Sequence, residues 1–398
     1  MGNRGSLYLL SINECGMYKL IIFSFLTYLS LFFCSCDEEE KKSLVELRQT
    51  NEFCSFDIPD DVKCSSLCVQ LFSDGGKDYI AYKNEFEQEI LFYELASENM
   101  VKRIVFPKEG KNSIAGGFWG FHVVDLDNIY IPSLYQNIIY VSDSIGYIKK
   151  TIGFEKTDSG KKLIPFIPGM YGEIVFIDGK LYIPQTVNPM LGDKMIDESP
   201  IGAVIDTLSG NNYALPMTFP HLITQSDIGT LAGTGLNYNR CFDGKRFVYS
   251  FYYSDVVYVA DINHQNIREC AIKSAYVDDV DVPNRTLTDP NEVLKYNVEH
   301  SRYGRIYYDK YRDVYYRIVY PANDFDENLP RIGRKNFSII ILDKELNIIG
   351  ETLFPDNLFV SELLFITDKG LYISTNNERN PDFDENLLKF ERIELKKL

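Results

Sequence analysis

The chain has 398 residues and a formal net charge of −16, from 57 acidic and 41 basic side chains. This excess of negative charge repels nucleic acids and anionic lipid headgroups, so it excludes binding to either by electrostatic attraction. The length suits two ordinary domains or one large all-β domain. Aromatic residues make up 14% of the chain and are mostly Tyr and Phe, which favour β-sheet.

The amino terminus has the pattern of an export signal. Residues 20–33 are almost wholly apolar, and Lys19 supplies a positive charge before them. The run is too short to span a bilayer as a helix but suits the core of a signal peptide. We expect a signal peptide over residues 1–35, with translation starting at Met17.

The apolar run ends in Phe33-Cys34-Ser35-Cys36. A small residue followed by Cys resembles the lipobox of bacterial lipoproteins, which implies lipidation of Cys36, because Ser35 is small whereas Phe33 before Cys34 is bulky. An ordinary cleaved signal or a short membrane-associated helix is the alternative. The acidic residues of segment 36–43 resemble the tether of some surface lipoproteins, or form a plain solvated linker. We therefore expect an outer-membrane lipoprotein, periplasmic or surface-exposed, held by a lipid anchor at Cys36.

Six similar units follow over residues 44–398. Each unit reads as four short strands, and the first two join through a tight Asp/Gly turn such as Asp74-Gly75 or Asp178-Gly179, which is a hairpin signal. The second strands share an apolar residue, namely Ile80, Ile131, Ile183, Val248, Tyr316 and Ile373. Six such units predict an all-β fold, a six-bladed β-propeller in a single domain. No segment with helical periodicity is apparent after residue 43.

The ends of the propeller are predicted to meet. The last unit has only three strands and ends near Leu395, whereas residues 43–53 form a strand with no local partner. Pairing these two segments would complete the last blade and remove two open sheet edges. Two β-sandwich domains are the alternative architecture.

Cysteines and acidic repeats carry weaker signals. A disulfide among Cys54, Cys64 and Cys68 is compatible with an oxidising periplasm, whereas Cys241 and Cys270 are interpreted as buried thiols. The sequence DFDENL occurs at 324–329 and again at 382–387. Its oxygen ligands suit calcium, but the glycine and distal glutamate of a calcium loop are missing, so we interpret both copies as solvated loops and expect no metal.

One rim of the propeller is the candidate binding face, because the long connections 107–118, 155–172, 217–238, 273–303 and 185–200 gather there. Four inner strands on this rim begin with an aromatic residue, and two positions later come Phe121, Glu173, Arg240 and Arg305. These four side chains should converge at the mouth of the central channel, and aromatic rings beside Arg and Glu suit a glycan or an anionic peptide. The candidate binding residues are Trp119, Tyr171, Glu173, Tyr238, Arg240, Arg302, Tyr303 and Arg305. Alternatively, the rings wedge between blades and the charges pair with each other.

Charged side chains are densest over residues 299–321. Alternation along the strand places Arg305, Tyr307 and Asp309 on one face. Arg317 on the following strand is expected to need a carboxylate if it is buried. A structural ion network in the fifth blade explains the cluster as well as an active site does.

The lipobox-like start, the segment RYGRIYYDKYRDVYYRIVYP and the chain size resemble an uncharacterised lipoprotein family of the Bacteroidota, catalogued as domain of unknown function 4221. The resemblance covers nearly all of the chain after the leader and implies a six-bladed propeller. It brings no established activity, so it implies no catalytic residue.

Two functions are compatible with these observations. The first is a non-catalytic binding module that holds a glycan or protein partner on the long-loop face. The second is an enzyme that acts on a polysaccharide, with Glu173 or His300 as its acid or base. The four histidines lack metal-ligand spacing and no cofactor motif stands in its structural context, so we expect no cofactor and assign no activity.

Overall fold

A computed structural model describes residues 43–64, 66, 68–84, 87–170, 172–220, 237–280, 287, 289–327 and 335–398. The predicted signal peptide, Cys36, most of the acidic tether and Tyr171 lie outside these described residues, and so does part of the first DFDENL copy. No helix within the described ranges is long and apolar enough to cross a membrane.

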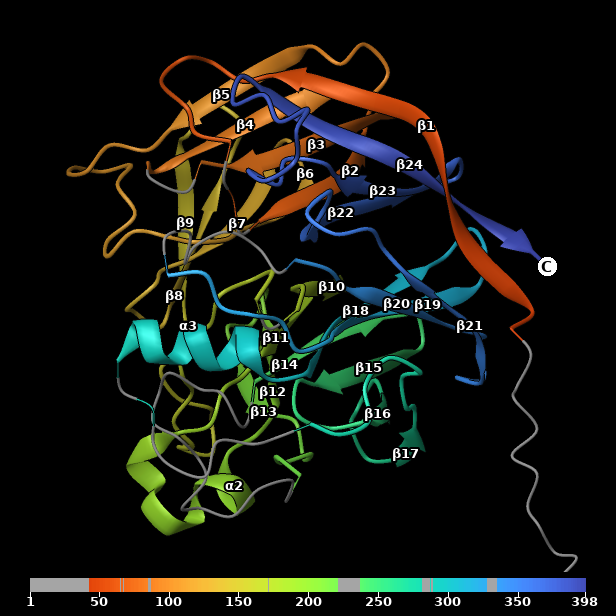
Figure 1. The fold of residues 1–398 in the computed structure, drawn as a ribbon. Coiled ribbons are helices and arrows are strands. Elements are labelled where there is room, and N and C mark those ends of the chain that lie inside the picture. The colour runs from red at the N-terminus through yellow and green to blue at the C-terminus, as the bar shows by residue number, and fades with distance from the viewer. Residues whose placement is uncertain are drawn as a thin grey trace, which may run out of the picture. The chain divides into compact units, whose positions relative to one another are not determined.

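The chain forms six four-stranded antiparallel sheets, which are the blades of a ring (Figure 1). The first three blades follow each other in chain order, with the innermost strand first. Blade 1 comprises β2 (Val69–Asp74), β3 (Lys77–Lys83), β4 (Glu89–Glu94) and β5 (Met100–Val105). Blade 2 comprises β6 (His122–Asp125), β7 (Asn128–Pro132), β8 (Ile138–Ser142) and β9 (Ile148–Gly153). Blade 3 comprises β10 (Val175–Ile177), β11 (Lys180–Pro184), β12 (Gly202–Asp206) and β13 (Asn212–Ala214).

The remaining blades complete the ring. Blade 4 comprises β14 (Tyr238–Phe242), β15 (Arg246–Phe251), β16 (Val256–Asp261) and β17 (Ile267–Ala271). Blade 5 comprises β18 (Arg302–Asp309), β19 (Val314–Tyr320), β20 (Ser338–Leu342) and β21 (Ile348–Leu353). Blade 6 comprises β22 (Val360–Thr367), β23 (Gly370–Ser374), β24 (Leu387–Lys397) and, at its outer edge, β1 (Val45–Asp57). The six-bladed propeller is thus confirmed, and the β-sandwich alternative is wrong.

The hydrophobic core lies between the blades. Six clusters of buried apolar side chains occur, and each joins one pair of neighbouring blades. Ile80 of blade 1, for example, shares a cluster with Leu363 of blade 6. The six predicted second-strand residues are all buried in these clusters. Burial of both faces of every blade is the force that closes the ring, because each sheet alone would expose two apolar faces.

The two ends of the described chain meet as the sequence predicted (Figure 1). Strand β1 pairs antiparallel with β24, from Val45 opposite Lys397 to Asp57 opposite Leu387. A bulge interrupts the pairing where Asn51 adopts a positive φ of 58°. The buried Glu391 carboxylate fills this bulge and accepts a 3.0 Å hydrogen bond from the Asn51 amide. The ends of the propeller are therefore fixed by backbone pairing and by a specific polar contact.

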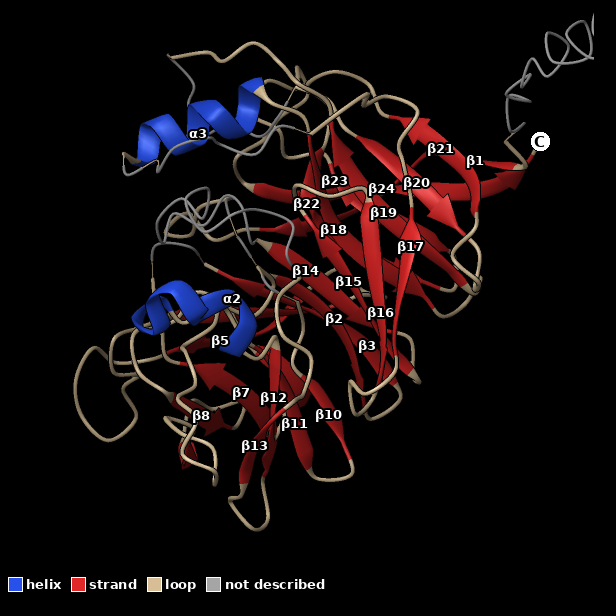
Figure 2. Cartoon of the chain, turned by 90° about the horizontal axis from the view of Figure 1, so that it is seen from below, coloured by secondary structure: helices blue, strands red, loops and turns tan. Residues whose placement is uncertain are grey.

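Helices occur on the long-loop side, which corrects the expectation that none follows residue 43. The connection between β11 and β12 holds η1 (Pro189–Lys194) and α2 (Met195–Glu198), and α3 (Pro290–Glu299) precedes β18. Helices α2 and α3 lie on the same side of the sheets (Figure 2). The Asp289 side chain caps α3 by accepting the Asn291 amide at 2.7 Å, and Pro290 occupies the first turn. Because α3 buries none of its residues, it lacks the apolar stripe by which helices are recognised in a sequence.

The buried arginine of blade 5 corrects a second expectation. Arg317 is fully buried, yet its guanidinium forms no ion pair among the described residues. Five neighbouring groups of blade 4 accept its hydrogen bonds, and the distances run from 2.6 to 3.4 Å: the Ser250 hydroxyl and the carbonyls of Phe251, Ser254, Asp255 and Ile272. Its guanidinium carbon also lies 3.8 Å from the Tyr303 ring centroid. Burial lowers the pKa of Arg317 to about 10, so the side chain remains cationic at neutral pH and joins blades 4 and 5.

The cysteines and the acidic repeats are structural or exposed. All five described cysteines are free thiols. The second DFDENL copy lies between β23 and β24, and the described part of the first lies between β19 and β20. Arg379 pairs with Asp326 at 2.9 Å and so connects the two loops. No group of acidic, His and Cys side chains in the described chain has the arrangement of a metal site.

Candidate binding site in the central channel

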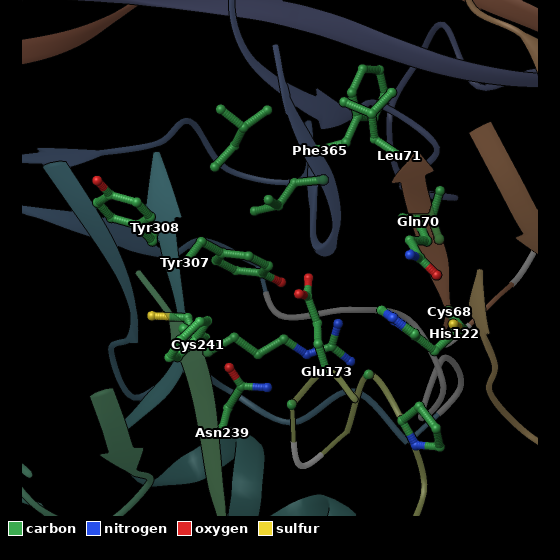
Figure 3. A pocket seen from close by; sticks show the side chains of 18 of the residues that line it. Cys68, Gln70, Leu71, His122, Glu173, Asn239, Cys241, Tyr307, Tyr308 and Phe365 are labelled. Atoms are coloured by element: carbon green, nitrogen blue, oxygen red, sulfur yellow. The ribbon is translucent and has the colours of Figure 1, made fainter. Parts of the chain in front are cut away.

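The inner strands of all six blades enclose a cavity of about 370 Å³ (Figure 3). Its wall takes residues from β2, β14, β18 and β22, from the start of β6 and from the segment that precedes β10. Phe121, Glu173, Arg240 and Arg305 all belong to this wall, so the four positions that follow the aromatic residues meet in one space. They do so because each occupies an equivalent position in its blade.

Glu173 is placed by the glycine before it. Gly172 has a φ of 109°, and a side-chain carbon there would lie 2.6 Å from the carbonyl oxygen of Arg240. Glycine therefore allows the segment before β10 to approach β14 closely. The next residue then projects into the channel, where the Glu173 carboxylate and the Tyr307 hydroxyl point toward the same space (Figure 3).

The Glu173 carboxyl is an isolated acid. The residue is exposed to the open channel, and the protein walls around the channel displace enough bulk water to raise the pKa of Glu173. Within the described part of the chain it has no hydrogen-bond or ion-pair partner. A carboxyl group with a raised pKa and free hydrogen-bonding capacity inside a cavity is a common mark of a functional site.

Three further titratable side chains of the wall, an imidazole and two thiols, are neutral at physiological pH. Burial lowers the pKa of His122 to about 4, so its imidazole is uncharged. Burial likewise raises the pKa of the Cys68 thiol to about 11, and it raises that of Cys241 well above its ordinary value. These side chains can donate or accept hydrogen bonds, but they add no charge to the channel.

A polar cluster joins blades 5 and 6 at the wall. Arg305 lies in the short stretch of β18 where the pairing with β19 shifts register. Its Nη1 donates a 3.0 Å hydrogen bond to the carbonyl of Glu362 on β22. The Glu362 carboxylate accepts hydrogen bonds from the hydroxyls of Tyr320 (2.7 Å) and Ser361 (2.9 Å). Burial would raise the pKa of Glu362, but the Tyr320 hydrogen bond and the positive charge of Arg305 lower it instead. Glu362 is therefore ionised.

The two cations beside Glu362 differ in exposure to the channel. Arg302 lies between two rings, with its guanidinium carbon 4.3 Å from the Tyr320 centroid and 5.1 Å from that of Tyr252. Arg305 lines the cavity itself. Burial alone would lower the pKa of Arg305, but the neighbouring Tyr307, Tyr252 and Glu362 raise it, so its guanidinium is charged. The charge that faces the channel here is that of Arg305.

Several candidate residues belong to the contacts between blades. Tyr238 is fully buried, and its hydroxyl donates to the carbonyl of Gln185 at 2.7 Å. Tyr303 is also buried, and its hydroxyl accepts the Ser274 amide at 3.2 Å. Neither ring is available to a ligand. Trp119, by contrast, is 44% exposed.

Arg240 leaves the channel after its first side-chain atoms. It is 2% exposed and donates to the Tyr182 carbonyl at 2.8 Å and to the Tyr249 hydroxyl at 3.1 Å. Its guanidinium carbon lies 4.6 Å above the Phe247 ring centroid. Arg240 therefore joins blades 3 and 4 and acts on the cavity through its charge.

Four polar residues of the wall were not among the binding residues predicted from the sequence: Gln70, His122, Asn239 and Glu362. Gln70 exchanges two hydrogen bonds with the backbone of Val123 on the next blade, at 2.8 and 2.9 Å, and the Asn239 side chain accepts the Ile306 amide at 3.2 Å. These amides hold neighbouring inner strands together. Their only signal in the sequence is a polar residue within an inner strand.

Comparisons with known proteins agree with this architecture. The family model described as domain of unknown function DUF4221 matches residues 45–353. A crystal structure of a DUF4221 member from Bacteroides vulgatus is similar to the chain with 25% sequence identity and a TM-score of 0.80, and the alignment covers 90% of this chain and 100% of that one.

A second structure, of a protein from Bacteroides fragilis whose name describes it as a candidate exported protein, has 10% identity and a TM-score of 0.50 over 89% of this chain and 96% of that one. At this identity the likeness concerns the fold alone. No protein with a curated description matches the chain significantly. From the match over most of its length, the chain belongs to the DUF4221 family of six-bladed β-propellers.

Proposed function

We propose that the protein is a cell-envelope lipoprotein that acts as a non-catalytic binding module and holds a hydroxyl-rich ligand, such as a glycan, at its central channel. The observation that carries the proposal is the unpartnered Glu173 carboxyl within a cavity of about 370 Å³. The cavity volume falls in the usual range for small-molecule sites, roughly 300–1,000 Å³. Neutral His122 and the Tyr307 hydroxyl provide further hydrogen-bonding groups for such a ligand.

The amino-terminal segment supports the cell-envelope location. The apolar run 20–33 lies just before Cys36, and a structurally similar protein from Bacteroides fragilis is described as a candidate exported protein. Metabolic labelling with a clickable fatty acid tests the anchor. Label should appear on the wild-type chain and disappear in Cys36→Ser; label that persists in this variant contradicts lipidation at Cys36.

Binding is tested with the full chain carrying Cys36→Ser, applied to an array of neutral and acidic oligosaccharides. Glu173→Ala removes the channel carboxyl, and Trp119→Ala removes the exposed ring on the long-loop side. Both should weaken binding about tenfold, the loss expected from one good polar or stacking contact. Tyr213→Ala, at an exposed position on the outer strand β13, is the matched control. No binding to any glycan, or equal binding by all variants, would remove the proposal.

An enzyme that acts on polysaccharides is the second candidate, and the raised pKa of Glu173 is the observation that favours it. A carboxyl group whose pKa is raised by burial holds its proton more tightly than usual, which suits a general acid. His300, the other residue considered for that role, does not line the cavity, and it stacks on Tyr296 with ring centroids 3.8 Å apart. Incubation of the same glycans at high protein concentration should give products that Glu173→Gln does not form; intact glycans exclude this activity.

A further inference from the structure

We propose that the channel site selects an acidic sugar, and that Arg305 binds the carboxylate of this ligand. The inference rests on the proposed function and specifies the ligand class. It is carried by the charge of the cavity wall and by the unsatisfied binding capacity of two of its side chains.

The charged side chains of the channel wall have a net positive charge, whereas the protein as a whole is negative. The chain as a whole has a net charge of −16, yet the charged side chains of the cavity wall are three cations and two acids: Arg240, Arg305, Lys310, Glu173 and Glu362. Arg302 adds a further cation behind Glu362, as its effect on the pKa of that carboxyl indicates. A positive site in a negative protein attracts anions locally, because enclosed walls of low dielectric focus the field of nearby charges.

The Arg305 guanidinium forms no ion pair among the described residues, although the charge of the Glu362 carboxylate acts on it from farther away. Its hydrogen bond goes to the backbone carbonyl of Glu362, and no carboxylate of the described residues lies within ion-pair distance of it. The Glu362 carboxylate is already engaged by two hydroxyls. Arginine presents further N–H donors in a plane that matches a carboxylate. A ligand carboxylate in the cavity can accept hydrogen bonds from the guanidinium donors that the Glu362 carbonyl leaves available.

Tyr307 supports the same site. Its hydroxyl is buried and has no partner of good hydrogen-bond geometry among the described residues. The Arg305 side chain is nevertheless its neighbour, and its charge and a weak hydrogen bond lower the pKa of Tyr307 against the larger, raising effect of burial. A ligand group held by Arg305 would therefore lie within reach of a second donor. Arg305 and Tyr307 are neighbours on the same inner strand and both line the cavity, so together they can hold one ligand group.

Glu173 makes the selection depend on pH. The titratable groups that line the cavity with it are His122, the thiols of Cys68 and Cys241, the hydroxyls of Tyr307, Tyr308 and Tyr311, the cations Arg240, Arg305 and Lys310, and the anion Glu362. An ionised Glu173 repels a ligand carboxylate, whereas a protonated Glu173 can donate a hydrogen bond to it. Acid binding should therefore strengthen as the pH falls from 8 toward 5, while the ligand itself stays ionised.

The experiment compares trigalacturonic acid with its methyl ester, which has the same hydroxyl groups but no charge. Titration calorimetry with the full chain carrying Cys36→Ser should give an affinity for the acid at least about tenfold above that for the ester, as expected for one charge-assisted contact. Arg305→Gln should abolish this preference, so that the acid and the ester bind with similar affinity. Arg305→Lys should retain part of it. Arg268→Gln, at an exposed position on β17, is the control for loss of one positive charge.

Glu362→Gln retains the size of the side chain beside Arg305 but removes its negative charge, which opposes a ligand carboxylate. This variant should therefore bind the acid more tightly, and it tests the inference even if Arg305→Gln does not fold. A preference that survives in folded Arg305→Gln, or an ester that binds as well as the acid, overturns the inference but not the proposed function. If neither compound nor any other glycan binds, the proposed function itself fails. A trisulfated trisaccharide, used as a third probe, decides between a carboxylate-specific site and general anion binding; stronger binding of the sulfated sugar overturns the assignment to a carboxylate.

Discussion

Arg305 on β18 donates its 3.0 Å hydrogen bond to the backbone carbonyl of Glu362 on β22, so a residue of the channel wall also joins blades 5 and 6. Both residues lie where the pairing of an inner strand with its neighbour shifts register. A bulge re-aims the side chains around it, which here brings polar groups of adjacent blades together. The candidate site thus depends on irregularities in two strands that otherwise follow the regular pattern of the propeller.

The first prediction concerns the buried cation. Arg317→Met should reduce the free energy of unfolding by about 3 kcal/mol or more, because four carbonyls and one hydroxyl of blade 4 lose a charged donor without gaining water. Arg317→Lys should recover part of this loss. Urea unfolding followed by tyrosine fluorescence measures both. A loss no larger than that of Arg268→Met, at an exposed position, would show that the carbonyls do not need the guanidinium.

The second prediction tests the closure of the ring. Gly350→Ala on β21 should lower stability by about 1–3 kcal/mol, because the added carbon would lie 2.1 Å from the carbonyl oxygen of Val45 on β1. Gly153→Ala on β9 meets no atom within 4 Å and is the matched control. Thermal unfolding of both variants distinguishes them. Equal melting temperatures would mean that β1 does not pack against blade 5 as described.

The third prediction follows from the raised pKa of Glu173. The folded protein holds this proton more tightly than the unfolded chain does, so the contribution of Glu173 to stability is greatest below the unfolded pKa and declines as the pH rises through the folded pKa. Glu173→Gln removes this dependence. The variant should therefore be more stable than the wild type at pH 8, and the difference should shrink toward pH 4. Parallel urea titrations at both pH values check the sign; a wild type that gains stability relative to the variant as the pH rises would contradict it.

Much of the scaffold could be predicted from the sequence because its signals are local and repeated. Ile80 and its counterparts lie in short apolar, Tyr-rich runs that follow polar turns, such as Asp74-Gly75 and Asp178-Gly179, and both features act within a few residues. Helix α3 was not predicted because it buries no apolar side chain, so its sequence has no apolar repeat of helical spacing. Its start is fixed instead by the cap at Asp289.

The roles of the site residues were less predictable. Tyr238 and Tyr303 share the sequence pattern of rings at a channel mouth, but both are buried between blades, whereas Trp119 in the equivalent position is exposed. Arg240 and Arg305 also occupy equivalent positions, and only Arg305 presents its guanidinium to the cavity. Which of two similar side chains turns inward depends on the neighbouring blade, and a single sequence does not contain that information.

The sequence by itself determined the repeat, the number of blades and the pairing of the two ends, because strand alternation and turn chemistry are properties of neighbouring residues. Only the tertiary structure decided that Arg317 is satisfied by carbonyls, that Glu173 has no partner among the described residues, and that Arg305 and Glu362 meet. These features arise between blades whose residues lie tens to hundreds of positions apart, so burial and charge at each position are set by packing across the ring.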